Sequence, residues 1–386
     1  MPSPLIERLS RLRGGASGVR KSISALAKTG LIGRMKETKY DGYRLTYGGL
    51  DYLALHTHAS KRHVYSVGSR IGVGKESDIM IVADETGVQR VLKIHRLGRI
   101  SFRTVKSNRD YLRKNQTGSW MYLSRLAATK EFAFMTALRD EGFPVPEPIA
   151  HSRHTIVMTL IDALPLRQIS AVPDPASLYA DLISLILRLA RHGLIHGDFN
   201  EFNILVKEET KPTSDDTPEQ PAATTTLTPI LIDFPQMVSM DHSNAEMYFD
   251  RDVACIKTFF SRRFHFTPSE PGPFFADAKK TVGRNGARRL DAALEASGFT
   301  KKMAKDLEAA IRAQQEDIVA KSSEGEEDDE EDDDDQEEEG GEEDREDGTQ
   351  QEELRALVVG DGKTSNKYNL TGSEPAMERL AISADT

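Results

Sequence analysis

Asp198 and Asn203 stand five residues apart in a polar loop, which lies between the apolar segments 194–195 and 204–206. The apolar segments are typical of short buried strands, and the polar centre is typical of a loop held between them. A carboxylate can accept a proton from an alcohol, and an amide oxygen five residues further on can hold a cation. An ordinary hydrophilic turn is the alternative, so the chemical interpretation depends on the rest of the chain.

Three further residues occur in an order that suits phosphoryl transfer, namely Lys93, Glu131 and Asp233. Lys93 lies in the apolar run Val-Leu-Lys-Ile, where an ammonium group is costly unless it finds a partner. Glu131 falls on a predicted helix and is the expected partner, with Asp140 and Glu141 as alternatives. Protein kinases use these residue types in the same order, with the lysine on ATP phosphates and the downstream Asn and Asp on magnesium.

A glycine-rich hairpin is predicted just before the strand that carries Lys93. Its glycines would let backbone N–H groups approach phosphates, and a serine stands where a third glycine is common. The spacing does not fit a Walker A loop, and a plain hairpin turn is the alternative. The residues expected to contact nucleotide here are Gly72, Val73, Gly74, Lys75 and Ser77.

The charge of the chain is distributed very unevenly. The 386 residues carry a net charge of −10, but residues 324–353 alone contain 21 acidic side chains and one arginine, a net charge of −20. The remainder is therefore at −10 + 20 = +10, and a basic body with an acidic tail indicates a nucleic-acid partner. The single cysteine excludes a disulfide framework and favours a reducing compartment. No apolar run approaches the roughly 20 residues that span a bilayer, and no secretory signal is visible.

Two basic surfaces are candidates for contact with RNA. Residues 1–60 predict a helix at 5–12, a helix at 17–28 capped by Ser17, strands at 31–38 and 43–47 around a turn at 40–42, and a helix at 50–55 after two glycines. This order resembles a winged helix that is truncated at its start, with Arg20, Lys21 and Lys28 exposed and no acidic residue to neutralise them. The second surface is the basic segment 96–125, in which aromatic residues are interleaved; a solvated loop is the alternative. Its cations are Arg99, Arg103, Lys106, Arg109, Arg113 and Lys114.

The remaining pattern alternates helices and strands around the candidate residues. Helices are predicted at 123–138, 178–189, 247–260 and 290–320, and strands at 79–82, 89–95, 155–161 and 230–232. Residues 207–228 are of low complexity and predict a disordered insertion in a hairpin, and residues beyond 322 predict a disordered tail.

Taken together, these motifs resemble the RIO kinases, an atypical serine/threonine kinase family, and within it the second subfamily, which carries an N-terminal winged helix. The resemblance covers residues 15–320. It is carried by Gly72-Val-Gly-Lys-Glu-Ser-Asp78, Lys93, Leu97-Gly-Arg-x-Ser-Phe-Arg103, Ser124-Arg-Leu-x-x-x-Lys-Glu-Phe132, His196-Gly-Asp-Phe-Asn-Glu-Phe-Asn203 and Leu231-Ile-Asp-Phe-Pro-Gln-Met237.

The resemblance implies an α+β, two-lobed protein-kinase-like fold behind a partial winged helix. The expected divisions are 1–60 for the winged helix, 61–161 for the N-lobe, 162–285 for the C-lobe, 286–321 for a helical segment and 322–386 for the tail. It also implies a serine/threonine kinase that depends on ATP and Mg²⁺. Such an enzyme could act mainly as an ATPase. The implied role is late maturation of the small ribosomal subunit, as a monomer away from membranes, in the cytoplasm with nuclear shuttling. The implied partners are the precursor of that subunit, ribosomal RNA and assembly factors.

Individual roles follow from the same resemblance. Lys93 would hold phosphates and be positioned by Glu131, while Asn203 and Asp233 would bind magnesium. Asp198 would be the general base, and Asp233 could itself accept the γ-phosphoryl group as an aspartyl-phosphate. The residues expected to frame adenine are Met158, Ile161 and Ile232.

Some features of regulated protein kinases are missing from the sequence. Pro235 replaces the glycine of Asp-Phe-Gly, and Gly197 replaces the arginine that pairs with a phosphorylated activation loop. Regulation by activation-loop phosphorylation is therefore not expected. Two alternative functions remain at this stage: a catalytically weak RNA-binding scaffold, and a small-molecule phosphotransferase of the aminoglycoside type, which shares the His-Gly-Asp loop.

Overall fold

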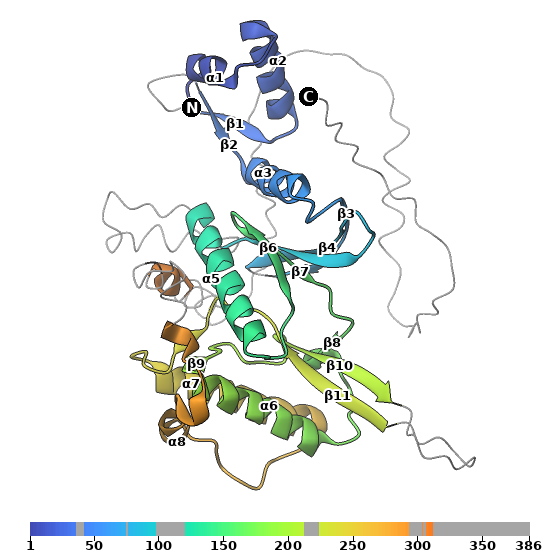
Figure 1. The fold of residues 1–386 in the computed structure, drawn as a ribbon, viewed down its shortest axis with the longest axis vertical. Helices are drawn as coiled ribbons and strands as arrows, with labels where there is room; N and C mark the ends of the chain where they lie inside the picture. The colour runs from blue at the N-terminus through green and yellow to red at the C-terminus, as the bar shows by residue number, and fades with distance from the viewer. Residues whose placement is uncertain are drawn as a thin grey trace, which may run out of the picture. The chain divides into compact units, whose positions relative to one another are not determined.

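The computed structural model describes residues 1–35, 42–74, 76–97, 120–211, 224–292, 303 and 306–311. The chain divides into two units, residues 1–320 and 321–386, and all the described residues belong to the first. Within it the elements run in the order expected of a winged-helix module followed by two kinase-like lobes (Figure 1). The predicted fold class is confirmed.

The N-terminal module combines helices with a short antiparallel hairpin. Its helices are α1 (Ser3–Ser10), α2 (Gly15–Lys28) and α3 (Tyr47–Ser60), and its strands are β1 (Ile32–Met35) and β2 (Gly42–Leu45). The strands pair in register from Ile32 with Leu45 to Met35 with Gly42. The predicted helix, hairpin and helix are present, and residues 36–41, which include most of the predicted turn, lie outside the described residues.

Two predictions about helix starts in this module are wrong. The glycines expected before the last helix lie inside α3, because Thr46 caps it and its Oγ1 accepts a hydrogen bond of 3.1 Å from Gly49 N. A Cβ on Gly49 would stand 2.0 Å from Leu31 O, so this glycine permits close packing of α3 on the hairpin. In α2, the predicted N-cap Ser17 lies within the helix, which begins at Gly15.

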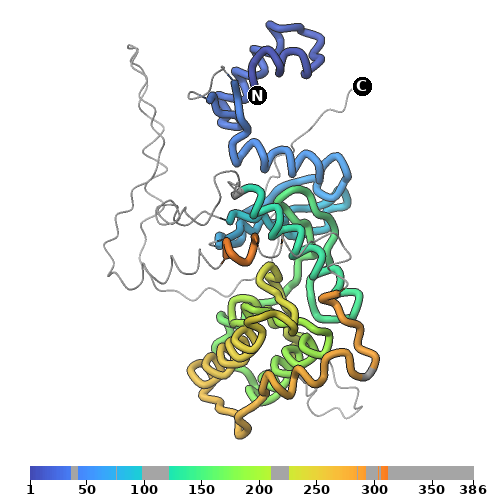
Figure 2. Tube along the Cα trace, turned by 90° about the vertical axis from the view of Figure 1, so that its left-hand side faces the viewer, coloured from blue at the N-terminus to red at the C-terminus, as the bar shows by residue number. Residues whose placement is uncertain are grey.

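The N-lobe is built on a five-stranded antiparallel sheet, against which both α3 and a long helix of the lobe itself pack (Figure 2). The strands lie in the order β3 (Ser66–Val73), β4 (Ser77–Ala83), β5 (Gln89–His95), β7 (Thr155–Thr159) and β6 (Pro148–Ser152). The helix α5 (Trp120–Asp140) contacts β5, β6 and β7. In β5, Lys93 is paired with Ile79 on one side and Ile156 on the other, so the sheet holds its backbone rigidly.

The C-lobe packs short strand pairs against two long helices. Its elements are β8 (Leu164–Pro165), η2 (Leu166–Gln168), α6 (Pro175–Arg191), β9 (Leu194–Ile195), β10 (Ile204–Lys211), β11 (Thr224–Leu231), β12 (Val238–Ser239), α7 (Ala245–Phe264), α8 (Phe275–Lys280) and η3 (Arg284–Gly286). α6 begins at a proline behind Asp174, whose side chain accepts hydrogen bonds from two amides of the first turn. α6 and α7 contact each other and share one apolar core with α5 and the sheet.

The predicted disordered insertion at 207–228 is wrong at both of its ends. β10 and β11 continue into it and pair as far as Lys211 with Thr224, while residues 212–223 lie outside the described residues. The threonines at 224–226 and 228 favour extended backbone, and Lys207 and Glu209 form an ion pair along one strand. Low sequence complexity concealed this local strand propensity.

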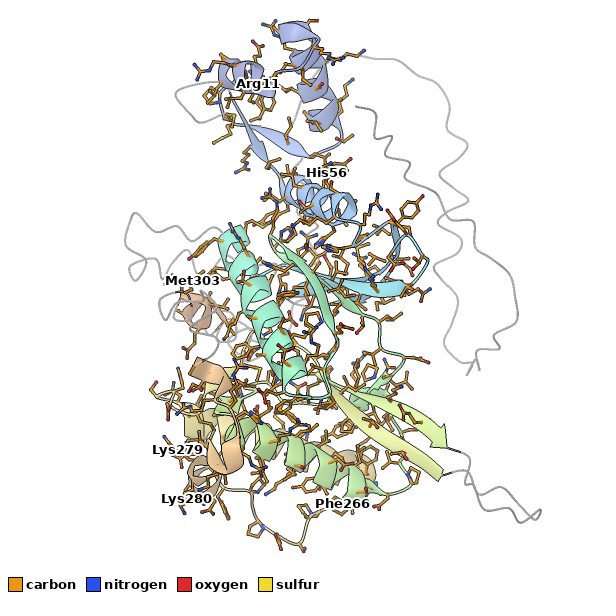
Figure 3. The ribbon with its side chains drawn as sticks, in the orientation of Figure 1. Arg11, His56, Phe266, Lys279, Lys280 and Met303 are labelled. Atoms are coloured by element: carbon orange, nitrogen blue, oxygen red, sulfur yellow. The ribbon has the colours of Figure 1, made fainter. Side chains whose placement is uncertain are left out.

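The predicted C-terminal helix is only partly described. Residues 290–292, 303 and 306–311 are helical, and Leu307 and Ile311 are buried against Leu97 and α5 in a small apolar cluster. Met303, labelled in Figure 3, packs against the same cluster. The acidic tail lies outside the described residues. Among those described, no helix combines the length and hydropathy needed to cross a bilayer.

We predict that His58 makes stability sensitive to acid. This residue of α3 is buried, its Nε2 lies 2.9 Å from Thr155 Oγ1, and burial together with His63, His151 and Lys61 lowers its pKa to about 4. The unfolded chain binds a proton at its ordinary pKa of 6.5, so this contribution is complete above pH 6.5 and declines as pH falls toward 4. Urea unfolding between pH 4.5 and 7 should show that His58→Gln takes up as much as about one proton fewer on unfolding than the wild type, so its stability falls less steeply as the pH is lowered. An unchanged pH slope would contradict the assignment.

Candidate active site

Lys93 is the centre of the candidate site. Its Nζ donates a hydrogen bond of 2.7 Å to Glu131 Oε1 and one of 2.8 Å to Asp233 Oδ1. These three side chains come from β5, from α5 and from the segment after β11. Burial alone would lower the pKa of Lys93, but the charges of Asp233 and Glu131 outweigh it and raise that pKa, so the ammonium stays charged.

Glu131 is fully buried, and its carboxylate pairs with two basic side chains, Lys93 and His95. Its Oε2 lies 2.8 Å from His95 Nε2, one residue pair further along β5. Burial would raise the pKa of Glu131, but Lys93 and His95 lower it, so the carboxylate is ionised. The structure therefore pairs Lys93 with Glu131 and not with the alternatives Asp140 and Glu141.

The loop between β9 and β10 holds Asp198 in one orientation. Asn203 Nδ2 donates 2.7 Å to Asp198 Oδ2, and Asn200 Nδ2 donates 2.8 Å to Oδ1. Burial and the negative charge of Asp233 raise the pKa of Asp198 above its ordinary value. Because its Nδ2 is occupied by Asp198, Asn203 has its side-chain oxygen available to meet a cation.

Asp252 is an important residue that the sequence analysis missed. Its Oδ2 accepts 2.9 Å from Gly197 N and its Oδ1 accepts 3.0 Å from Phe199 N, so it clamps the loop on either side of Asp198. Arg251 donates from Nη2 to Gly197 O. The helical period offered a signal, since Asp252 falls on the buried face of α7 where an apolar residue is expected. Burial raises the pKa of Asp252 to about 7 despite these hydrogen bonds.

Gly197, which stands in place of the kinase arginine, has a steric role of its own. Its φ of +77° lies in the left-handed region, and a Cβ there would come within 2.7 Å of Gln236 O. The next loop, which carries Asp233, therefore approaches the Asp198 loop directly. His196 Nε2 also donates to Ile232 O at 3.2 Å, which joins the two loops beside the site.

Asp233 combines an unusual backbone with an accessible side chain. Its φ is +70°, a conformation that non-glycine residues adopt rarely and that clusters at functional sites. Its side chain is 38% exposed, in contrast to Lys93 and Glu131, which are buried. Asp233 therefore offers an anionic oxygen that a ligand can reach.

The oxygens of this site fit a magnesium ion that is shared with a ligand. Asp233 offers a carboxylate and Asn203 an amide oxygen, and hard oxygen donors of this kind suit Mg²⁺. No group of three His, Cys, Asp or Glu residues that could hold a metal occurs in the described part of the chain. A protein that supplies only one or two ligands to Mg²⁺ commonly relies on substrate phosphates for the rest.

The glycine-rich hairpin is formed by β3 and β4, with Gly72 inside β3 opposite Ile79. Gly74 N donates 2.7 Å to Ser77 O and closes the turn, and Lys75 lies outside the described residues. Glu76 was not singled out from the sequence. Burial and the nearby carboxylate of Asp233 raise its pKa to about 7.

The predicted adenine residues differ in their surroundings. Met158 is buried in the main core on β7, opposite Val91 of β5, whereas Ile161 and Ile232 are half-buried. Ile232 N also donates to Asn203 O at 3.1 Å. Val73, at the end of β3, is exposed. The structure therefore places Ile232 beside the loop that carries Asp198, whereas Met158 lies within the sheet of the N-lobe.

The two predicted RNA surfaces are only partly visible. Residues 98–119 lie outside the described residues, and with them all six cations expected in the second basic surface. On α2, the prediction that no acidic residue neutralises the cations is wrong for Arg20, whose Nε lies 3.2 Å from Glu7 Oε1. Both partners are solvent-accessible, so the interaction is screened and weak.

Known proteins resemble this sequence over most of its length. The sequence matches the families described as "RIO domain", over residues 78–220 and 222–271, and "Rio2, N-terminal", over residues 1–62. It is 52% identical to serine/threonine-protein kinase rio2 of Schizosaccharomyces pombe over 308 residues, which are 80% of this chain and 83% of that protein. The corresponding kinase of Saccharomyces cerevisiae is 45% identical over 334 residues, 82% of this chain and 75% of that protein.

A solved structure is also similar over most of its length. The crystal structure of the Rio2 kinase-ADP/Mg²⁺-phosphoaspartate complex from Chaetomium thermophilum shares 79% sequence identity with this chain, at a TM-score of 0.73. The match covers 82% of this chain and 91% of that one.

Proposed function

Because this chain belongs to the Rio2 branch of the RIO serine/threonine protein kinases, we propose that the site around Lys93 and Asp198 binds ATP with Mg²⁺ and transfers its γ-phosphoryl group. The observation that carries the proposal is the position of Lys93 Nζ between Glu131 and Asp233, at 2.7 and 2.8 Å. A buried ammonium held in this way is a fixed positive charge at the point where phosphates must be bound.

Each residue of the site has a distinct role in this proposal. Glu131 positions the ammonium of Lys93, which meets phosphate oxygens of ATP. Asn203 and Asp233 supply oxygen ligands to Mg²⁺, which neutralises phosphate charge when it is bound. Asp198 orients an attacking hydroxyl group or water molecule and accepts its proton.

Asp233 has a second role in the proposal, as the acceptor of the phosphoryl group. One of its carboxylate oxygens forms a bond to the γ-phosphorus while the bond from that phosphorus to the bridging oxygen breaks, which releases ADP and leaves an aspartyl-phosphate. Its exposure of 38%, beside the ammonium of Lys93, supports this role. The phosphoaspartate in the related Chaetomium complex supports it independently.

A nucleotide titration tests the site directly. Wild-type protein should bind ATP in the presence of Mg²⁺, and Lys93→Met should weaken that binding by at least about tenfold, because it removes the fixed charge. Lys130→Met is the matched control, since Lys130 is also a buried lysine of the N-lobe but contacts the Phe134 ring instead of the site. Equal affinities of wild type and Lys93→Met would contradict the proposed site.

We further propose that the protein acts in late maturation of the small ribosomal subunit. It would bind ribosomal RNA and assembly factors on the precursor particle as a monomer, in the cytoplasm with nuclear shuttling. Support comes from the excess positive charge outside the acidic segment 324–353 and from the match of residues 1–62 to the Rio2 N-terminal family.

The RNA contact predicts a dependence on salt. Each phosphate neutralised on a duplex contributes about 0.9 to the slope of log affinity against log salt. Replacing Arg20, Lys21 and Lys28 of α2 with alanine should therefore lower that slope by up to about three, while ATP turnover of the isolated protein stays unchanged. Binding to small-subunit precursors across a salt series measures the slope, and an identical slope for both proteins would mean that α2 is only a solvated surface.

A further inference from the structure

Arg96 follows β5 directly and holds the exit of the glycine-rich turn. Its backbone N donates 2.6 Å to Glu76 O, and its Nε donates 3.0 Å to Asp78 Oδ2. Asp78 is only 6% exposed. Arg96 therefore binds the chain on both sides of Ser77, the residue at which β4 begins. It also lies three residues after Lys93 on the same segment.

The other edge of the Arg96 guanidinium is held by the N-terminal module. Its Nη1 donates 2.9 Å to Asp51 Oδ1 and its Nη2 donates 2.6 Å to Asp51 Oδ2, a bidentate pair with a residue of α3. His154, buried next to β7, donates from Nε2 to the same Asp51 Oδ1 at 2.7 Å. Asp51 thus has both of its oxygens engaged by residues of the kinase N-lobe, against which α3 packs at β6 (Figure 1).

Asp51 and Arg96 both stay ionised in this network. Burial would raise the pKa of Asp51, but the hydrogen bonds from His154 and Arg96 outweigh it and lower that pKa. Burial would likewise lower the pKa of Arg96, whereas Asp51 and Asp78 raise it. The side chains of Arg96 and Asp51 are only 19% and 17% exposed, so solvent screens their interaction less than it screens a surface pair.

We propose that Asp51 and Arg96 are positioning residues for nucleotide binding, through which the docking of α3 fixes the glycine-rich turn. This inference rests on the proposed function, because it assumes that the turn contacts nucleotide. Gly72 and Gly74 lead into the turn from β3 and restrict the backbone little, so the geometry of the turn depends on what holds its ends. Arg96 supplies that restraint at the β4 end, and Asp51 fixes Arg96.

Nucleotide affinity must then respond to a residue of the N-terminal module that lies outside the site. Asp51→Asn keeps the shape of the side chain but removes its charge and one of the two acceptor oxygens facing Arg96. We expect this variant to bind MgADP about five- to twentyfold more weakly than wild type, which is the lower part of the usual range of coupling between linked sites. KM for ATP should rise by a similar factor, while kcat changes little, since Lys93 and Asp198 are untouched.

A matched control separates positioning from general stability. Asp84 and Arg90 form an ion pair at the opposite end of β4 and β5, at 2.7 Å, with side chains 12% and 20% exposed. Asp84→Asn therefore removes a comparable pair on the same two strands, remote from the turn. It should lower the thermal midpoint as Asp51→Asn does but leave the affinity for MgADP unchanged. If the thermal midpoint falls in both variants and the affinity for MgADP falls in neither, the Asp51 network is merely structural and the inference is overturned.

Hydrogen exchange on the wild-type protein provides a test that needs no mutation. Because coupling is reciprocal, MgADP should slow amide exchange in α3 as well as in residues 76–78. Protection of the turn without protection of α3 would overturn the inference and leave the proposed function standing. Failure of wild-type protein to bind MgADP at all would overturn the proposed function, and this inference with it.

Discussion

Replacing Asp198 with alanine should lower ATP turnover by about 10²- to 10⁴-fold, which is the usual contribution of a positioned general base. The structure gives the reason, since Asn200 and Asn203 fix the two carboxylate oxygens of Asp198 in a single orientation. Nucleotide binding should survive, because the phosphate contacts belong to Lys93. Steady-state turnover and MgADP affinity, measured on the same preparation, separate these two effects.

Asp250 provides the matched control for this change. It is an exposed carboxylate on α7, two residues before Asp252, which holds the Asp198 loop. The variant Asp250→Ala should turn over ATP at the wild-type rate. If Asp198→Ala retained full turnover, Asp198 would not be the base. If it lost nucleotide binding as well as turnover, the substitution would have disturbed the loop as a whole.

The second large effect is expected from Asp233→Asn. The substitution removes a charged oxygen ligand, so Mg²⁺-dependent nucleotide binding should weaken by at least about tenfold, which is the lower end of what loss of even an outer partner of a metal ligand costs. Asparagine tolerates the left-handed backbone that Asp233 adopts, with φ at +70°, so the loop itself should persist. Titration with ADP, in the presence and absence of Mg²⁺, measures the metal-dependent part of the affinity.

Asp241→Asn is the control for the charge change. Asp241 pairs with Arg289 at 2.6 Å on the surface of the C-lobe. Its substitution should therefore leave the nucleotide affinity unaltered. A loss of affinity in Asp233→Asn that is the same without Mg²⁺ would show that Asp233 acts through Lys93 alone and does not bind the metal.

The residues to which we assign chemistry could be singled out in the sequence because two of them are unusual for their surroundings. Lys93 is a charge in an apolar strand, and Asp233 directly follows one. Asp252 was missed although it is equally anomalous, since its position on the buried face of α7 becomes clear only when the limits of that helix are known. Asp252 acts by holding the Asp198 loop in place through two backbone amides, and its own position is on a helix outside that loop.

Arg96 illustrates what a sequence cannot provide. Its partners Asp51 and Asp78 lie 45 and 18 residues away along the chain, and nothing in their spacing indicates that they meet. Such a contact depends on how α3 packs against the sheet, which is a tertiary property. The strands that extend into residues 207–228 were missed for a different reason, because low complexity was given more weight than the strand propensity of threonine.

The central claim is that Asp233 and Lys93 form a working phosphoryl-transfer site, and the chemistry of the phosphorylated protein tests it most directly. Wild-type protein is incubated with γ-labelled ATP and Mg²⁺, quenched in acid and treated with hydroxylamine, which cleaves acyl phosphates but not phosphate esters. The account predicts a covalent label that hydroxylamine releases and that is absent from Asp233→Asn. A label that resists hydroxylamine and maps only to serine or threonine would contradict the assignment of Asp233 as the phosphoryl acceptor.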